Sequence, residues 1–145
     1  MTAQGPGQIL FRFVRHWSRR PVTGDSGAEQ GRLVLVSEAV HALSQRAVSA
    51  TVNAIAHEIG IDQSGASRLI KNATSAGYVV MAASAADGRQ REAALTPAGR
   101  SLLEQAHRWQ EEIFGHLTTG WSEKQRRDFQ QAMTDLMHRS YAMDA

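Results

Sequence analysis

Apolar residues recur at intervals of three and four along most of this 145-residue chain, a pattern typical of helices that bury one face. The first such segment covers residues 8–20, with the apolar positions Ile9, Leu10, Phe13, Val14 and Trp17. The second covers about 29–45, with the apolar positions Leu33, Val36, Val40 and Leu43. Turn-forming residues fill 20–27, so we predict two amphipathic helices joined by a loop.

Two shorter helices are expected next, with a tight turn between them. Residues 52–60 have helical periodicity and end at Gly60, which can take a positive φ and let the chain turn within three residues. Asp62 is a helix-capping residue type, so we expect it to begin a second helix that runs to about residue 76. Ile61 is expected to fill the angle between the two helices.

The pattern then changes to two strand-like segments, 78–84 and 89–96, separated by the hairpin-turn pair Asp87–Gly88. Thr96 and Pro97 open a long helix. A capping box at 122–125 opens the last one. The order predicts a mainly α fold with a small β-hairpin wing, a winged helix-turn-helix flanked by N- and C-terminal helices. The length predicts one domain over 1–145.

The segment 51–73 has the features of a helix-turn-helix that reads DNA. Its second helix carries polar side chains opposite its apolar residues, and in a major groove such side chains reach base edges and phosphates. The candidate DNA contacts in this segment are Asn53, Gln63, Ser64, Gly65, Ser67, Arg68 and Lys71. The alternative is a helical hairpin whose polar face is only solvated.

The hairpin that follows carries Arg89 and Arg91 close to its tip. A basic hairpin directly after a reading helix is typical of a wing, whose arginines can enter the adjacent minor groove. Asp87 is the expected wing anchor, through a salt bridge to one of these arginines, or it simply favours the turn. We therefore predict that residues 31–96 form the DNA-binding region.

Charge and composition narrow the classes of function. The net charge is only +2, but fourteen of the sixteen basic residues are arginine, which binds phosphate and guanine bidentately. Basic and acidic residues balance within 51–97, which keeps open a winged-helix protein-interaction module without DNA binding. The absence of cysteine excludes disulfides and thiol chemistry.

Other classes find little support in the sequence. There is no phosphate-binding glycine loop, nucleophile elbow or metalloprotease motif, so we expect neither an enzyme nor a cofactor. Glu111 and Glu112 are adjacent and point to different faces of a helix, so they cannot act as a catalytic pair. Without a signal-peptide pattern or a long apolar run, a cytoplasmic protein is expected.

Taken together, these segments resemble the MarR family of winged-helix regulators over about residues 33–105. The matching segments are 56–61, 67–70, 76–79, 87–89 and 95–100. The resemblance implies a transcription regulator, more often a repressor, that binds a pseudo-palindromic DNA operator as a homodimer. The sequence departs from the family at Gly65, where a polar side chain is more common, and at Gly88, where a second arginine is frequent.

The resemblance also implies that the flanking helices, 8–20 and 97–145, join the dimer. The expected interface residues are Leu10, Phe13, Trp17, Phe114, Phe129, Leu136 and Tyr141. Their aromatic content independently favours dimerisation, the alternative being that they pack within one chain.

Regulators of this family often release DNA when a small aromatic or phenolic effector binds. The residues expected to line such a pocket are His16, Trp17, His41, Met81 and Trp109, although each could equally be ordinary core. A metal-sensing regulator is an alternative, because His107 and Glu111 stand four residues apart on a predicted helix. Without cysteine or a tight histidine cluster, no metal site is predicted.

Overall fold

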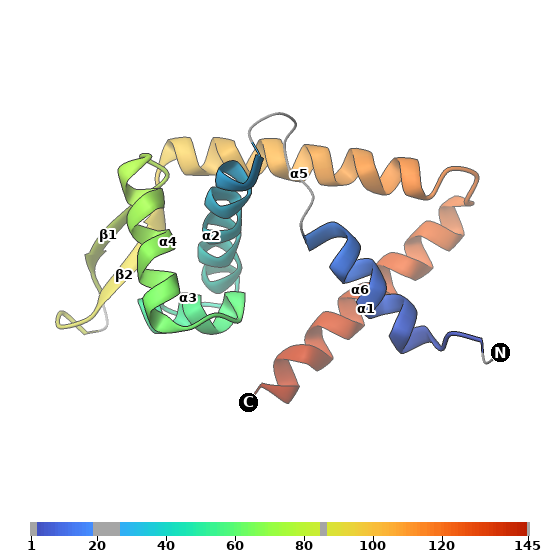
Figure 1. The fold of residues 1–145 in the computed structure, drawn as a ribbon, viewed down its shortest axis with the longest axis horizontal. Helices are drawn as coiled ribbons and strands as arrows, with labels where there is room; N and C mark the ends of the chain where they lie inside the picture. Colours follow the sequence, from blue (N-terminus) through green and yellow to red (C-terminus); the bar gives the residue numbers. More distant parts are fainter. Residues whose placement is uncertain (1–2, 19–26, 85–86, 145) are drawn as a thin grey trace. The chain divides into compact units, whose positions relative to one another are not determined.

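The computed structural model describes residues 3–18, 27–84 and 87–144. Its elements follow the predicted order (Figure 1): α1 (Pro6–Ser18), α2 (Gly27–Gln45), α3 (Val52–Ile59), α4 (Gln63–Ser75), β1 (Val79–Ala83), β2 (Arg91–Leu95), α5 (Pro97–Leu117) and α6 (Glu123–Met143). The predicted fold class, mainly α with a small β-hairpin wing, is confirmed. The chain divides into two compact units, Met1–Trp109 and Gln110–Ala145.

Local signals fix both helices of the helix-turn-helix. The Thr51 Oγ1 accepts the Ala54 N–H at 3.1 Å and begins α3, which ends at Gly60 with a φ of 84°. The Asp62 Oδ1 accepts the Gly65 N–H at 3.1 Å and begins α4. The predicted cap at Asp62 and the predicted left-handed Gly60 are therefore confirmed.

The core of the first unit is built by α2, both helices of the helix-turn-helix, the hairpin and the first turns of α5. Its most deeply buried side chains include Val36, Leu43, Ile55, Ala73, Val79 and Ala106. A Cβ at Gly99 would lie 2.1 Å from the Tyr78 carbonyl oxygen, so only glycine allows α5 to start against the backbone that directly precedes β1. The predicted cap of α5 is confirmed, because the Thr96 Oγ1 accepts the Gly99 N–H at 3.1 Å.

The two strands pair antiparallel, in a register that runs from Val79 opposite Leu95 to Ala83 opposite Arg91. The Ala93 N–H donates to the Ala50 carbonyl at 2.8 Å, which fixes β2 to the segment before α3. Because that N–H points away from β1, the hairpin is held to the helix-turn-helix through β2.

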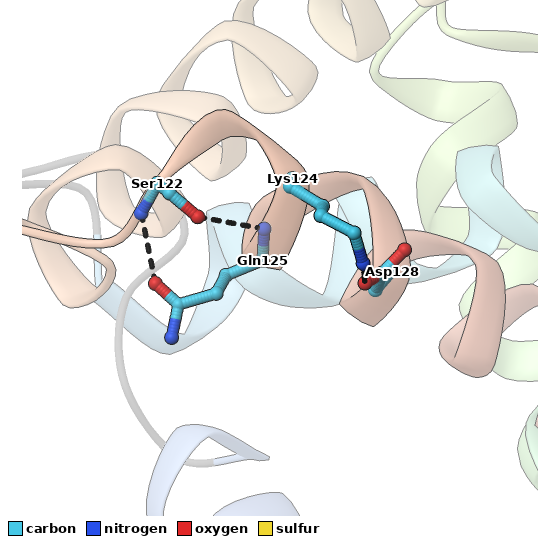
Figure 2. A network of polar contacts seen from close by, with 4 residues as sticks. All are labelled: Ser122, Lys124, Gln125 and Asp128. Atoms are coloured by element: carbon cyan, nitrogen blue, oxygen red, sulfur yellow. Dashed lines mark hydrogen bonds and ion pairs between the residues drawn. The ribbon is translucent and has the colours of Figure 1, made fainter.

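In the second unit, α6 begins with the predicted capping box (Figure 2). The Gln125 N–H donates to the Ser122 Oγ at 3.1 Å, and the Ser122 N–H donates to the Gln125 Oε1 at 2.9 Å. One turn further, the Lys124 Nζ lies 2.7 Å from the Asp128 Oδ2. This reciprocal cap confirms where the last helix starts.

An arginine clamp and three aromatic rings join α6 to the end of α5 within this unit. The Arg126 guanidinium donates to both the hydroxyl and the carbonyl oxygen of Thr118, each at 3.1 Å. The Phe129 ring stacks on Phe114 at 6.2 Å between centroids and meets the edge of Trp121 at 5.5 Å. The turn between the two helices is therefore held by both polar and aromatic contacts.

Predicted and observed boundaries agree within two residues wherever the structure describes them, and α2 already begins at Gly27. Positions 19 and 20 of the first predicted helix, and the predicted loop up to residue 26, lie outside the described residues. Ile61, expected to fill the angle between the two helices, is 37% exposed, so it is covered only in part. Its N–H donates to the Ala56 carbonyl at 3.0 Å, which helps to close the turn after α3. In the part of the chain that is described, no helix is long and apolar enough to cross a membrane.

Candidate nucleic-acid interface

The helix α4 has two sharply different faces. Its inner side buries Ala66, Ile70 and Ala73 in the core. The predicted contact residues on its other side are exposed, namely Gln63, Ser64, Ser67, Arg68 and Lys71. The helix is therefore fixed from behind and presents hydroxyl, amide and cationic groups to solvent.

The first turn of α4 is organised by the carboxylate of Asp62. Its Oδ2 accepts the Ser64 hydroxyl at 2.9 Å, and its Oδ1 accepts the Gly65 N–H. These two hydrogen bonds, to Ser64 first and then to the Gly65 backbone, lower the pKa of Asp62 from its usual value, and Arg68 adds a smaller favourable charge. The Asp62 side chain is therefore an ionised cap at the end of the helix that would enter a groove.

This cap also explains the glycine at position 65. A Cβ at Gly65 would lie 2.6 Å from the Asp62 Oδ1, so any side chain there would displace the capping carboxylate. The sequence identified Gly65 only as a departure from the family. The structure adds the physical reason, since glycine leaves room for the Asp62 cap.

An ion pair ties α3 to the residue that directly follows α2. The Arg46 Nη2 lies 2.8 Å from the Glu58 Oε2, and both side chains are largely buried. Asn53, the predicted contact on α3, is exposed near the start of that helix. Sequence reasoning missed the Arg46–Glu58 pair, because no local pattern links a residue in the turn after α2 to one on α3.

The wing turn is stabilised by Asp87. The Asp87 Oδ1 accepts the Arg89 N–H at 3.0 Å, and the Asp87 carbonyl accepts the Gln90 N–H at 3.0 Å. Between the described residues, no ion pair joins Asp87 to Arg89 or Arg91. Of the two roles expected for Asp87, the described contacts correspond to the turn-forming one.

Both wing arginines are exposed, but they differ in their contacts. The Arg91 Nη2 donates to the Met81 carbonyl at 3.1 Å, across the hairpin. No hydrogen bond or ion pair to another described residue holds the Arg89 guanidinium. Among the described residues, the Arg89 guanidinium thus makes no such contact, whereas one donor of the Arg91 guanidinium is engaged.

The residues predicted for an effector pocket fall into two groups. Trp17 meets His16 at 5.4 Å and Trp109 at 6.1 Å between ring centroids, forming one aromatic row. His41 instead lies 6.0 Å from His107, which the sequence had singled out only as a possible metal ligand. The His107 Nε2 lies 2.5 Å from the Glu38 Oε1.

An open pocket of about 440 Å³ lies beside His41, between α2, β2 and the start of α5. Besides His41 and His107 its lining includes Ser44, Arg100, Leu103 and Glu104. Trp17 and Trp109 do not line it, and Met81 packs against the core from β1. The sequence missed Arg100 and Glu104 because the cavity forms only when β2 and α5 come together.

The described residues contain no cluster of side chains suited to bind a metal ion. No group of three histidine, cysteine, aspartate or glutamate side chains among them could hold an ion. His107, one half of the predicted pair with Glu111, is instead bonded to Glu38 on α2.

The flanking helices expose long apolar faces. None of the thirteen described residues of α1 is buried, and neither is any of the twenty-one of α6. The exposed side chains among the predicted interface residues are Leu10, Phe13, Phe129 and Leu136, at 42–52% of their surface. Trp17, Phe114 and Tyr141 are partly buried.

A capped helix-turn-helix followed at once by a two-stranded hairpin defines the class of winged helix-turn-helix proteins. Residues 36–90 match the model of the MarR family. Over these residues the chain is therefore similar to the MarR family, in agreement with the shared fold described next.

Three solved structures illustrate the shared fold. Wild-type MarR from E. coli in its apo form is 16% identical, with a TM-score of 0.67, over 93% of this chain and 98% of that chain. A mutant of MepR from S. aureus bound to an oligodeoxyribonucleotide is 20% identical, with a TM-score of 0.56, over 94% and 99%. BpsR from Bordetella bronchiseptica, whose DNA binding is regulated by 6-hydroxynicotinic acid, is 20% identical, with a TM-score of 0.58, over 90% and 97%. Among curated proteins none matches the chain.

Proposed function

We propose that this protein is a sequence-specific DNA-binding transcription regulator that acts in the cytoplasm as a homodimeric repressor. The observation that carries the proposal is the exposed polar face of α4, backed by a buried one and followed directly by a basic wing. A helix of this kind enters the major groove with its N-terminal residues at the base edges. The proposed role is that of a regulator and not of an enzyme.

The proposed division of contacts follows from side-chain chemistry. Gln63, Ser64 and Ser67 lie in the first turns of α4, where short polar groups can reach base edges. Arg68 and Lys71 lie further along, where they can bind phosphates or guanine. Asn53 would bind the DNA backbone from the start of α3.

The proposed dimer is supported by the exposed apolar side chains of α1 and α6. Exposed apolar patches of this kind are unusual on monomeric proteins and typically mark an interaction surface. A second copy of the chain would cover Leu10 and Phe13 on α1, and Phe129 and Leu136 on α6, at the same time as it supplies a second reading helix. Two reading helices match the two half-sites of a pseudo-palindromic operator.

The proposed regulator releases DNA when a small-molecule effector binds. This release is supported by the open pocket beside His41, which touches both β2 of the wing and α5. A ligand that binds there would contact the wing and a long helix together. A thermal-shift screen of phenolic compounds and Zn²⁺ tests this part, and an effector must also lower DNA affinity.

The experiment that tests the main proposal is selection of binding sites from a random duplex library with the purified protein. Wild-type protein is expected to enrich a pseudo-palindromic sequence. Arg68→Ala is expected to weaken binding to it by about 1–3 kcal/mol if the guanidinium holds a base bidentately. Arg108→Ala, an exposed arginine on α5, is the matched control and should bind like wild type. Enrichment of no sequence would favour a winged-helix protein-interaction module instead.

A further inference from the structure

The two wing arginines are held in different ways. Arg91 is the first residue of β2 and lies opposite Ala83, and its Nη2 donates to the Met81 carbonyl at 3.1 Å. Arg89 precedes the strand, and only its backbone N–H has a hydrogen bond, to Asp87, among the contacts between described residues. The difference indicates two separate roles for residues that the sequence makes equivalent.

The carbonyl that Arg91 binds lies on the free edge of the hairpin. Met81 is opposite Ala93, whose N–H points away from β1 to the Ala50 carbonyl. The Met81–Ala93 pair is therefore a non-hydrogen-bonded pair, and the Met81 carbonyl points away from β2. Within the described residues no third strand pairs with β1, so this carbonyl has no ladder partner. The small side chain of Ala83, directly opposite Arg91, leaves room for the guanidinium to reach that edge.

The same bond connects the wing to the core. The Met81 side chain is partly buried and packs against the core of the winged region. The Arg91 hydrogen bond therefore links the start of β2 to a residue whose own position is fixed. Beyond it, the strand ends are joined by the Ser84 N–H donating to the Gln90 carbonyl at 2.8 Å. Arg89 lies just past this last bond, so its position depends on how firmly the two strands are held.

We propose that Arg91 is a positioning residue, which holds the hairpin in the shape that presents Arg89 to DNA and does not itself contact a phosphate. This inference rests on the proposed DNA-binding function. It assigns the electrostatic contact of the wing to Arg89 and the geometry of the wing to Arg91.

The test measures the affinity of the full-length protein for a fluorescent duplex, chosen by the binding-site selection above, as a function of salt. Removing one cation that neutralises a phosphate lowers the slope of log affinity against log salt by about 0.9. Arg89→Ala is expected to lower the slope by about that amount per subunit. Arg91→Ala should weaken binding several-fold at every salt concentration with the wild-type slope. Arg91→Lys, which keeps a donor long enough to reach Met81, should recover most of the affinity.

A second readout needs no DNA. Amide hydrogen exchange at Ala82 and Glu92, a pair that faces each other in the ladder, should be faster in Arg91→Ala and unchanged in Arg89→Ala. A slope that falls in Arg91→Ala as it does in Arg89→Ala would overturn the proposal, and so would unchanged exchange in Arg91→Ala. If wild-type protein binds no duplex, the proposed function fails, while the exchange measurement still decides the positioning role of Arg91.

Discussion

The winged region buries its apolar side chains within one chain, whereas the helices α1 and α6 leave theirs largely exposed. In the winged region, side chains such as Val36 and Ile55 have no exposed surface, and each helix of the helix-turn-helix has its own cap. In α1 and α6 no described residue is buried, although Phe13 and Leu136 are large and apolar. The winged region is thus stabilised by its own contacts, whereas the apolar faces of the flanking helices need a further surface. That contrast is why dimerisation and DNA reading can be tested separately.

The largest expected effect is on the core of the winged region. Ile55→Ala removes a fully buried side chain and should lower the free energy of unfolding by about 2–5 kcal/mol. Val48→Ala, at a side chain that is 44% exposed, is the control and should cost less than about 0.5 kcal/mol. Denaturant unfolding measures both. Similar costs for the two variants would mean that the core is placed incorrectly.

The next effect concerns α6. Leu136→Asp puts a carboxylate on the apolar face, so the dimer should dissociate more readily, by about 2 kcal/mol or more, while the winged region stays folded. Gln131→Asp, on an exposed polar position of the same helix, controls for the added charge. Sedimentation equilibrium gives the dissociation constants. A Leu136→Asp protein that dimerises like wild type would remove α6 from the interface.

A smaller effect tests the coupling between Gly65 and the cap of α4. In a helix, alanine is favoured over glycine by about 1 kcal/mol. Gly65→Ala should not gain this in wild type, because its Cβ would displace the Asp62 carboxylate. In an Asp62→Ala background the obstacle is absent, and Gly65→Ala should raise the thermal midpoint. Equal effects in the two backgrounds would show that the two residues are independent.

The smallest effect is a pH dependence. The pKa of Asp62 is lowered in the folded protein, so its contribution is present above the unfolded pKa and is lost as the pH falls through the folded value. Stability should therefore fall below about pH 4 in part because of this group. In Asp62→Asn, thermal midpoints measured from neutral to acidic pH should fall less steeply than those of wild type. Parallel curves would contradict an ionised cap.

Much of the fold could be predicted because its signals are local. Asp62, Thr96 and Ser122 cap the helices that follow them, and each acts within three residues of its own position. Contacts between distant segments leave no local pattern in the sequence. The hydrogen bond between His107 and Glu38, which are 69 residues apart, could therefore not be predicted.

In the candidate site, too, features set by local sequence could be predicted, whereas features set by tertiary packing could not. The exposed face of α4 follows from helical periodicity, so its residues could be selected from the sequence. The difference between Arg89 and Arg91 could not, since it depends on strand register and on which carbonyl lies at a free edge. The pocket beside His41 likewise exists only through the packing of β2 and α5 against α2.

The central claim is that the winged region, carried by a dimer, reads DNA. Its most direct test is the binding of the full-length protein to the selected duplex, measured by fluorescence anisotropy between about 50 and 200 mM salt. We expect two copies of the protein per duplex and an affinity that falls on the order of a thousandfold over that range. Absence of binding, or an affinity that does not change with salt, would contradict it.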